Sequence, residues 1–295
     1  MTTLAAFEIH PAATVAEASN LITELGDDAV IYSGGTELLL LMKLGFAAYG
    51  HLVDVKPIEE LNVLRVEDGD LLIGAAVTHR ELERSALVQS GWPDFGEMEQ
   101  RVANVRVRST GSLGGNLAFA DPHSDPATFL LAAGAHMELG AGNESRVLPL
   151  DDFVLGPFET ALDPGELLCG IRLPALSPGS AMSHLRFAFH ERPAATISAR
   201  VEVRDGRISE MRAAVGSVGV VPVVVPGTDA IIGQPVGAID AGVLAEIGQV
   251  GADASEPVSD SNGSSDYKHS LVQTLIGRAV NEAAELAAAR VTGAS

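Results

Sequence analysis

The sequence has a single cysteine, Cys169, among its 295 residues. One thiol excludes an internal disulfide, and it excludes an iron–sulfur cluster or zinc–thiolate site held by this chain alone, because each needs several thiolates. Apolar runs of membrane-spanning length are also missing, and Met1–Pro11 has neither the basic nor the apolar region of a signal peptide. We therefore expect a cytoplasmic protein without a membrane span.

Positive charge is scarce as well. Lysine and arginine total 19 against 39 acidic residues, which gives a formal net charge of −20. Such a surface repels phosphate backbones, so we expect no nucleic-acid partner. An acidic balance also favours solubility, and this ordinary explanation leaves the identity of protein partners open.

The first 56 residues have the pattern of a small α/β unit. The capping-box sequence Thr14-Val-Ala-Glu17 predicts the start of an amphipathic helix that ends at Gly26. A short buried strand at 29–32, a glycine loop, a helix at 38–44 and a strand at 52–55 are expected to follow. This order favours parallel strand pairing.

From residue 57 the pattern changes to mixed α+β with mainly antiparallel strands. The Asp68-Gly69 pair predicts a hairpin between strands at 61–66 and 71–75. Further strands are expected at 135–139, 146–150 and 167–173. The proline- and serine-rich segment 174–180 indicates a linker, and we place a domain boundary there.

We therefore expect an α+β fold with two domains, at residues 1–176 and 180–295. The first is predicted to divide into subdomains at about 1–56 and 57–176. The second is predicted to hold a three-stranded antiparallel sheet with a half-buried strand near 197–204, packed on a helix at 267–290.

The segment Ser33-Gly34-Gly35-Thr36-Glu37, called here the first loop, lies between a predicted strand and a predicted helix. Unpaired amides collect at a helix start, and the helix dipole there favours an anion. Glycine lets the backbone approach a phosphate closely, and the Thr36 hydroxyl can add a hydrogen bond. Taken alone, the loop is explained equally well as a tight turn without a ligand.

The segment Gly111-Ser112-Leu113-Gly114-Gly115-Asn116 is a second glycine-rich loop, called here the second loop. The chain has neither the GxGxxG fingerprint of a Rossmann fold nor a Walker A motif. Two glycine loops on different subdomains suit a diphosphate held from both sides, so a dinucleotide in the cleft between them is the natural ligand. Two unrelated glycine turns are the alternative.

An acidic segment, Ala120–Pro126, follows the second loop and precedes a helix predicted at 127–133. Asp125 is suited to accept hydrogen bonds from ribose or ribityl hydroxyls. Ser124 and Asp125 are also good helix N-caps. Capping is the better explanation for Ser124, whereas Asp125 stays open between the two roles.

These motifs resemble a known family, the flavin-binding medium subunits of molybdenum hydroxylases, which include carbon monoxide dehydrogenase and the FAD domain of xanthine dehydrogenase. The first loop, followed by Met42-Lys43 and His51-Leu-Val-Asp-Val55, is similar to the family's G-G-T-E/D-L-L, M-K and H-L-V-D-V motifs. The stretch 107–125 looks like I-R-x-x-x-T-I-G-G-N-x-x-x-x-D-P-x-x-D. Ser259-Asp260 and Asp266-Tyr267-Lys268 before a helix resemble the family's C-terminal S-D…Y-R, so the resemblance spans nearly the whole chain.

The resemblance implies FAD as the cofactor, a PCMH-type FAD-binding domain at 1–176 and a C-terminal domain of the molybdenum hydroxylase flavoprotein type at 180–295. Asp125 would bind the sugar-chain hydroxyls. The implied pyrophosphate contacts are Ser33, Gly34, Gly35, Thr36, Glu37, Gly111, Ser112, Gly114, Gly115 and Asn116. The implied partners are a small iron–sulfur subunit and a large molybdopterin subunit, in a dimer of heterotrimers, with the flavin passing electrons from the clusters to an external acceptor.

The stretch 186–195 departs from the family, because many relatives have a basic residue and a Gly-Asp pair there. This chain has Arg186-Phe-Ala-Phe-His-Glu-Arg-Pro-Ala-Ala195 instead. The isoalloxazine carries the redox chemistry itself, so we nominate no catalytic residue, and the histidines show no ligand spacing that predicts a metal site. A stand-alone FAD oxidoreductase and a flavin-free assembly scaffold are the alternatives.

Overall fold

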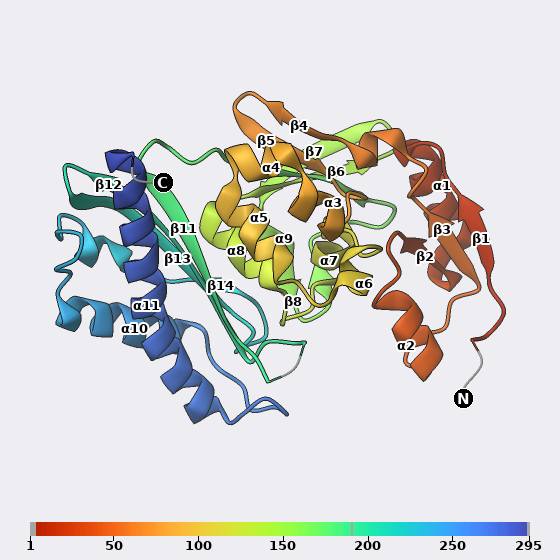
Figure 1. Cartoon of the computed structure of the whole chain (residues 1–295). Coiled ribbons are helices and arrows are strands. Elements are labelled where there is room, and N and C mark those ends of the chain that lie inside the picture. The colour runs from red at the N-terminus through yellow and green to blue at the C-terminus, as the bar shows by residue number, and fades with distance from the viewer. Residues whose placement is uncertain (1–3, 190, 294–295) are drawn as a thin grey trace.

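The computed structural model describes residues 4–189 and 191–293. Figure 1 shows these residues as three neighbouring units in chain order, called here the N-terminal unit (4–56), the central unit (57–176) and the C-terminal unit (180–293). Among the described residues, none of the helices combines the length and apolar character needed to cross a bilayer.

The N-terminal unit is built on a three-stranded parallel sheet in the order β1 (Glu8–Pro11), β3 (His51–Asp54), β2 (Ala29–Tyr32). The parallel pairing confirms the prediction. Helix α1 (Val15–Leu25) is capped by Thr14 and ends at Gly26, where the 3-10 turn η1 (Gly26–Asp28) begins, and α2 (Leu38–Leu44) follows β2. Strand β2 is half-buried rather than buried, because it is an edge strand that borders a cleft.

The central unit holds a five-stranded antiparallel sheet in the order β4 (Leu64–Glu67), β5 (Asp70–Gly74), β10 (Leu167–Leu173), β6 (His136–Ala141), β7 (Glu144–Pro149). Asp68 and Gly69 both adopt positive φ in the predicted hairpin. Strand β4 starts at Leu64 rather than at residue 61, because the preceding residues form the 3-10 turn η2 (Glu59–Asn62).

The remaining elements of the central unit are short helices and one small hairpin. They are α3 (His79–Arg84), α4 (Ala86–Gly91), α5 (Pro93–Gln100), α6 (Val105–Arg108), α7 (Leu113–Phe119), α8 (Asp125–Ala133), α9 (Leu150–Phe153), β8 (Val154–Gly156) and β9 (Glu159–Thr160). Helix α3 begins with a capping box, in which Thr78 Oγ1 accepts from the Glu81 amide and the Glu81 carboxylate accepts from the Thr78 amide.

The C-terminal unit has an antiparallel sheet in the order β11 (Ser180–Phe187), β12 (Ala195–Arg204), β13 (Arg207–Gly216), β14 (Val223–Val224). The first three are the predicted strands, and β14 adds a two-residue strand at the edge. Along the chain, β14 is followed by η3 (Thr228–Ile231), α10 (Ala241–Ala254) and α11 (Ser265–Thr292).

Strand β12 is buried on both faces, whereas the alternation of its residues predicted a half-buried strand. Ile197, Ala199 and Val201 pack in the core beneath α11. The opposite face meets α8 of the central unit, where Thr196 Oγ1 lies 2.9 Å from Thr128 Oγ1. Polar residues on this face are therefore covered by the neighbouring unit rather than by solvent.

Other contacts also join the C-terminal and central units. The Asp94 carboxylate accepts hydrogen bonds from the Met182 amide at 2.8 Å and from Arg290 Nη1 at 3.0 Å. Met182 and Ala214 belong to the central hydrophobic core. These contacts bring the stretch after β11 toward the cleft that the first two units form.

Candidate functional site

A cleft of about 540 Å³ lies where the N-terminal and central units meet, within the usual range for small-molecule sites. The first loop, between β2 and α2, forms one wall. The second loop, which runs from the turn after α6 into the first turn of α7, forms the wall opposite. The structure thus brings together two glycine loops that are about seventy-five residues apart in the sequence.

The two loops pack directly against each other at one end of the cleft. A Cβ atom at Gly34 would lie 2.2 Å from the Thr110 carbonyl oxygen and 2.6 Å from Gly111 Cα. Ser33 Oγ and Ser112 Oγ are 2.9 Å apart, so the two hydroxyls share a hydrogen bond. Gly34 is therefore required for the loops to meet.

The first loop presents backbone N–H groups without protein acceptors. Within residues 4–189 and 191–293, no hydrogen bond is formed by the amides of Gly34, Gly35, Thr36 and Glu37. Gly35 has a φ of +67°, which a side chain rarely adopts, and its Cβ would also strike the Tyr32 ring at 2.4 Å. Four free donors just before α2 form a concentrated site for an anion.

The second loop uses its amides internally. Leu113 N donates to the Val77 carbonyl and Gly114 N to the Ala75 carbonyl, each at 3.0 Å. Gly115 N donates to Ser112 Oγ at 3.1 Å, which caps α7. The second loop therefore presents mainly side chains and a glycine surface to the cleft, and Ser112 has its only amide without an acceptor among the described residues.

Ten of the eleven predicted site residues line the cleft. They are Ser33, Gly34, Gly35, Thr36, Glu37, Gly111, Ser112, Gly115, Asn116 and Asp125. The eleventh, Gly114, faces away, and its Cβ would meet Ala75 Cβ at 2.4 Å. Gly114 thus allows α7 to pack closely on the chain after β5.

Asp125 is a buried carboxylate, 5% exposed, at the first position of α8. It accepts from Arg186 Nε at 3.2 Å and lies 3.3 Å from His184 Nε2, both on β11. Ser124 supplies the helix cap through the Ala127 amide, as expected, and also donates to Asn116 Oδ1 at 2.6 Å. The C-terminal unit therefore fixes the orientation of the Asp125 carboxylate.

Arg192 joins the first loop to the acidic segment after the second loop. Its guanidinium is 2.9 Å from a Glu37 oxygen and 3.2 Å from an Asp121 oxygen. Burial acts to raise the pKa of Asp121, but hydrogen bonds from His123 and the Arg192 charge outweigh it, so the pKa lies below its usual value. Asp121 is therefore a stable anion in neutral solution.

His79 lies beneath the second loop and also borders the cleft. It is 2% exposed, and its Nδ1 is 2.7 Å from Glu99 Oε2. The Glu99 side chain is fully buried, and its Oε1 has no hydrogen-bond partner among the described residues. This pair was not predicted, because an isolated histidine in a capping sequence gives no indication of its partner.

The C-terminal motif reaches the other end of the acidic segment. His123 lies 3.1 Å from Asp121 through Nδ1 and 3.4 Å from Asp260 through Nε2. Asp260 accepts from the fully buried Lys268 at 2.7 Å, and against the raising effect of burial this bond lowers the Asp260 pKa. A continuous series of side-chain contacts thus connects Asp121 with Lys268 through His123 and Asp260.

The sequence predicted the glycine loops but not the charged groups around them. Arg186 and Arg192 fall in the stretch 186–195 that departs from the family pattern, and residue 190 of that stretch lies outside the described residues. The sequence does show that residues 186 and 192 are basic, but it does not show which groups they contact. Their acidic partners could not be read from spacing, because 61 to 155 positions separate each pair.

Comparison with known proteins gives matches along nearly the whole chain. Residues 5–176 match the model described as "FAD binding domain in molybdopterin dehydrogenase", and residues 188–283 match "CO dehydrogenase flavoprotein C-terminal domain". The carbon monoxide dehydrogenase medium chain of Hydrogenophaga pseudoflava is 31% identical over 284 residues, covering 94% of this chain and 96% of that one.

Two further matches extend this result. The nicotine 6-hydroxylase medium subunit of Paenarthrobacter nicotinovorans is 29% identical, covering 92% of this chain and 95% of its own. A solved structure of carbon monoxide dehydrogenase from Hydrogenophaga pseudoflava superposes with a TM-score of 0.91 at 30% identity, covering 97% of this chain and 99% of that one. The fold and the order of its units are thus shared over the full length.

Proposed function

This chain belongs to the family of FAD-binding medium subunits of molybdenum hydroxylases, and from this membership we propose that it passes electrons from the iron–sulfur clusters of a partner subunit, through FAD, to an external acceptor. Residues 1–176 would form the FAD-binding domain, with subdomains at about 1–56 and 57–176. Residues 180–295 would form a second domain that orients the acidic groups of the cleft.

The single observation that carries the proposal is the set of free amides in the first loop. FAD contains a pyrophosphate, and Gly34, Gly35, Thr36 and Glu37 offer consecutive N–H donors before a helix start. At Gly115, on the opposite wall, an added Cβ would meet only Ser112 Oγ within 4 Å, at 2.9 Å. The residues present therefore fit an anionic dinucleotide.

Roles for the predicted contacts follow from these positions. The first-loop amides and the Thr36 hydroxyl would hold the pyrophosphate, and Ser112, Asn116 and the Gly115 surface would close the opposite side. Asp125, fixed by Arg186 and His184, would accept hydrogen bonds from sugar-chain hydroxyls. Gly111 and Gly114 would act by shaping the second loop.

Bound FAD supplies the redox chemistry, since its isoalloxazine accepts and releases electrons. The chain itself would bind and orient the cofactor. Arg192 pairs with both Glu37 and Asp121, and so would link the first loop to the acidic segment at that end of the cleft. The buried Glu99 carboxylate fixes the His79 ring beside the second loop through Nδ1.

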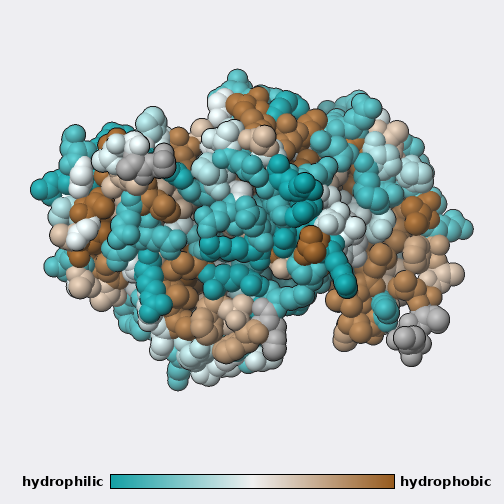
Figure 2. Space-filling model, in the orientation of Figure 1, coloured by the Kyte–Doolittle hydropathy of each residue, from teal (hydrophilic) through white to brown (hydrophobic). Residues whose placement is uncertain are grey.

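The relatives are medium subunits, and this chain has a surface suited to partners. Figure 2 shows hydrophobic surface over α2, at the lower right of the view. Leu40, Leu44 and Phe46 are 46%, 56% and 78% exposed there. Contiguous apolar surface of this kind marks protein contacts. We propose a small iron–sulfur subunit and a large molybdopterin subunit as partners, arranged as a dimer of heterotrimers.

The test is to express the chain with and without its neighbouring subunits and to record FAD content, mass and turnover. One FAD per chain and reduction of that flavin only in the presence of the partner subunits are expected. A complex without flavin would overturn the proposal in favour of an assembly scaffold. A free chain with full turnover would overturn it in favour of a stand-alone oxidoreductase.

A further inference from the structure

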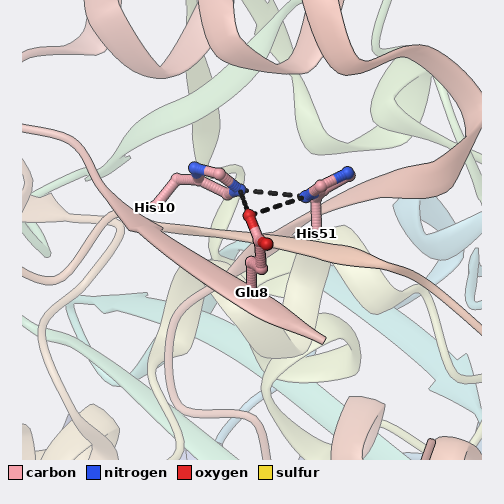
Figure 3. A group of neighbouring side chains, drawn as sticks. All are labelled: Glu8, His10 and His51. Carbon is pink, nitrogen blue, oxygen red and sulfur yellow. Dashed lines mark hydrogen bonds and ion pairs between the residues drawn. The ribbon is translucent and has the colours of Figure 1, made fainter. Parts of the chain in front are cut away.

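Three potential metal ligands converge on the surface of the N-terminal unit, away from the cleft. They are Glu8 and His10 of β1 and His51 of β3, and Figure 3 shows the two imidazoles and the carboxylate directed toward a common point. None of the three lines the cleft. The parallel register explains the arrangement, because Glu8 pairs with His51 and His10 follows Glu8 by two positions on the same face.

The separations between the donor atoms suit one small cation. His10 Nε2 and His51 Nδ1 are 3.0 Å apart, and Glu8 Oε2 is 3.9 Å from the first and 4.0 Å from the second. A tetrahedral zinc ion with bonds of about 2.0–2.1 Å separates its ligand atoms by about 3.4 Å. The observed distances bracket this value, so small side-chain rotations would bring all three onto one ion.

Hydrogen bonding alone explains only part of the cluster. One imidazole N–H can donate to the other ring, which accounts for the His10–His51 contact. The Glu8 carboxylate is too far from either ring for a hydrogen bond, yet it lies on the same side as both ring nitrogens. Two imidazoles and one carboxylate form a donor set that zinc uses in known proteins.

We propose that Glu8, His10 and His51 bind a divalent first-row transition-metal ion, with Zn²⁺ as the representative ion. Nitrogen ligands favour Zn²⁺, Ni²⁺ or Co²⁺ over Mg²⁺ and Ca²⁺, which prefer oxygen ligands. The protein's net charge of −20 raises the local concentration of cations. The three side chains are 75%, 26% and 28% exposed in the order Glu8, His10, His51, so an ion can reach them from solvent.

The bound ion would fasten an edge strand. Strand β1 has only four residues, and among the described strands it pairs on one side, with β3. An ion held by both strands cross-links them independently of the backbone hydrogen bonds. Metal binding to the folded state alone stabilises that state, so occupancy should strengthen the attachment of the N-terminal segment.

The experiment is calorimetric titration of the tag-free, FAD-loaded chain with ZnCl₂, NiCl₂ and MgCl₂ at neutral pH. We expect one Zn²⁺ and one Ni²⁺ site per chain and no Mg²⁺ binding in the same range. The variants His10→Ala and His51→Ala should weaken Zn²⁺ binding by more than the roughly 10- to 100-fold that loss of an outer partner costs. His136→Ala removes an exposed histidine of β6 and serves as the matched control.

A second readout separates ligand loss from misfolding. FAD content of each variant should equal that of the wild type, because the cluster lies outside the cleft. X-ray absorption at the zinc edge should show two imidazoles and oxygen ligands at about 2.0–2.2 Å. Wild-type Zn²⁺ affinity in the two histidine variants, or no Zn²⁺ site in the wild type, would overturn the proposal whether or not the chain holds FAD.

Discussion

The first loop leaves four successive amides, from Gly34 to Glu37, without an acceptor among the described residues, whereas the second loop gives its amides at Leu113, Gly114 and Gly115 to internal oxygens. Both segments are rich in glycine. In the first loop the glycines help to expose backbone donors. In the second loop they allow close packing against Ala75 and Val77. Glycine content therefore identifies where backbones approach closely, but not whether the neighbour is a ligand or another part of the chain.

The largest effect is expected where the two loops touch. Gly34→Ala places a methyl group 2.2 Å from the Thr110 oxygen, and this backbone neighbour cannot rotate away. Overpacking of this kind costs about 1–3 kcal/mol. If FAD binding needs the closed arrangement of the loops, the same cost weakens FAD affinity by about 5- to 150-fold. Chemical unfolding and fluorimetric FAD titration measure the two effects.

Gly91→Ala is the matched control for that variant. Gly91 ends α4, and an added Cβ there meets nothing within 4 Å. We expect unchanged FAD affinity and equal or slightly higher stability, because alanine is the better helix former. Equal FAD loss in the two glycine variants would show that contact between the loops does not control binding.

The second prediction separates two neighbouring glycines within the second loop. Gly114→Ala would place its Cβ 2.4 to 2.6 Å from Ala75 atoms, so we expect a stability loss of about 1–3 kcal/mol. Gly115→Ala would crowd only the Ser112 hydroxyl, and a shift of that hydroxyl weakens the cap of α7, so we expect a smaller stability loss of about 1 kcal/mol or less.

For FAD affinity we expect the opposite order, with the larger loss in the Gly115→Ala variant. Gly115 borders the cleft and Gly114 does not, so the folded Gly115→Ala protein should bind FAD more weakly than the folded Gly114→Ala protein. Thermal midpoints and FAD dissociation constants measured in parallel give the comparison. FAD loss that simply follows stability in both variants would contradict the division of roles.

The third prediction concerns Asp125, the cleft carboxylate that follows the second loop at the start of α8. Asp125→Asn keeps the size of the side chain and removes its charge. Loss of part of a charge-assisted hydrogen bond, roughly 1 to 1.4 kcal/mol, should weaken FAD binding about fivefold to tenfold. Unchanged FAD affinity would indicate that the carboxylate serves only to join α8 to Arg186 and His184.

Much of the fold was predictable because local patterns specify it. The Thr14 cap, the Asp68-Gly69 turn and the alternation along β12 each indicated an element before any tertiary contact was known. The half-buried prediction for β12 was wrong, because the polar side of that strand is covered by α8, which lies 62 residues or more before it in the sequence. Burial by a distant element leaves no periodic mark on the strand.

The sequence predicted the glycine loops of the site, but not the contacts between its charged side chains. Loop positions follow from glycine and helix starts, whereas the pairs Asp125–Arg186, Glu37–Arg192 and His79–Glu99 depend on tertiary packing. The His10–His51 contact is similar, since 41 residues separate two histidines that adjacent strands place side by side. Ligand spacing along the chain is informative only when one element carries several ligands.

The smallest effect is expected from the ionic bridge between the two walls. Asp121 has a pKa below its ordinary 3.8, so its contribution to stability is fully present above that value and is lost as the pH falls through the lower folded-state pKa. Stability from the contacts that Asp121 makes with His123 and Arg192 should therefore be constant from neutral pH to about pH 5 and decline only below about pH 4. Because the Arg192 side chain is 53% exposed, the Asp121–Arg192 contact is worth about 0–1 kcal/mol at most.

Asp121→Asn should lower the thermal midpoint slightly at neutral pH and flatten the loss of stability in acid. Asp152→Asn, at an exposed position of α9, should follow the wild type. An acid decline of equal slope in both variants would show that the walls are held together by the Ser33–Ser112 contact and the packing at Gly34 rather than by charge.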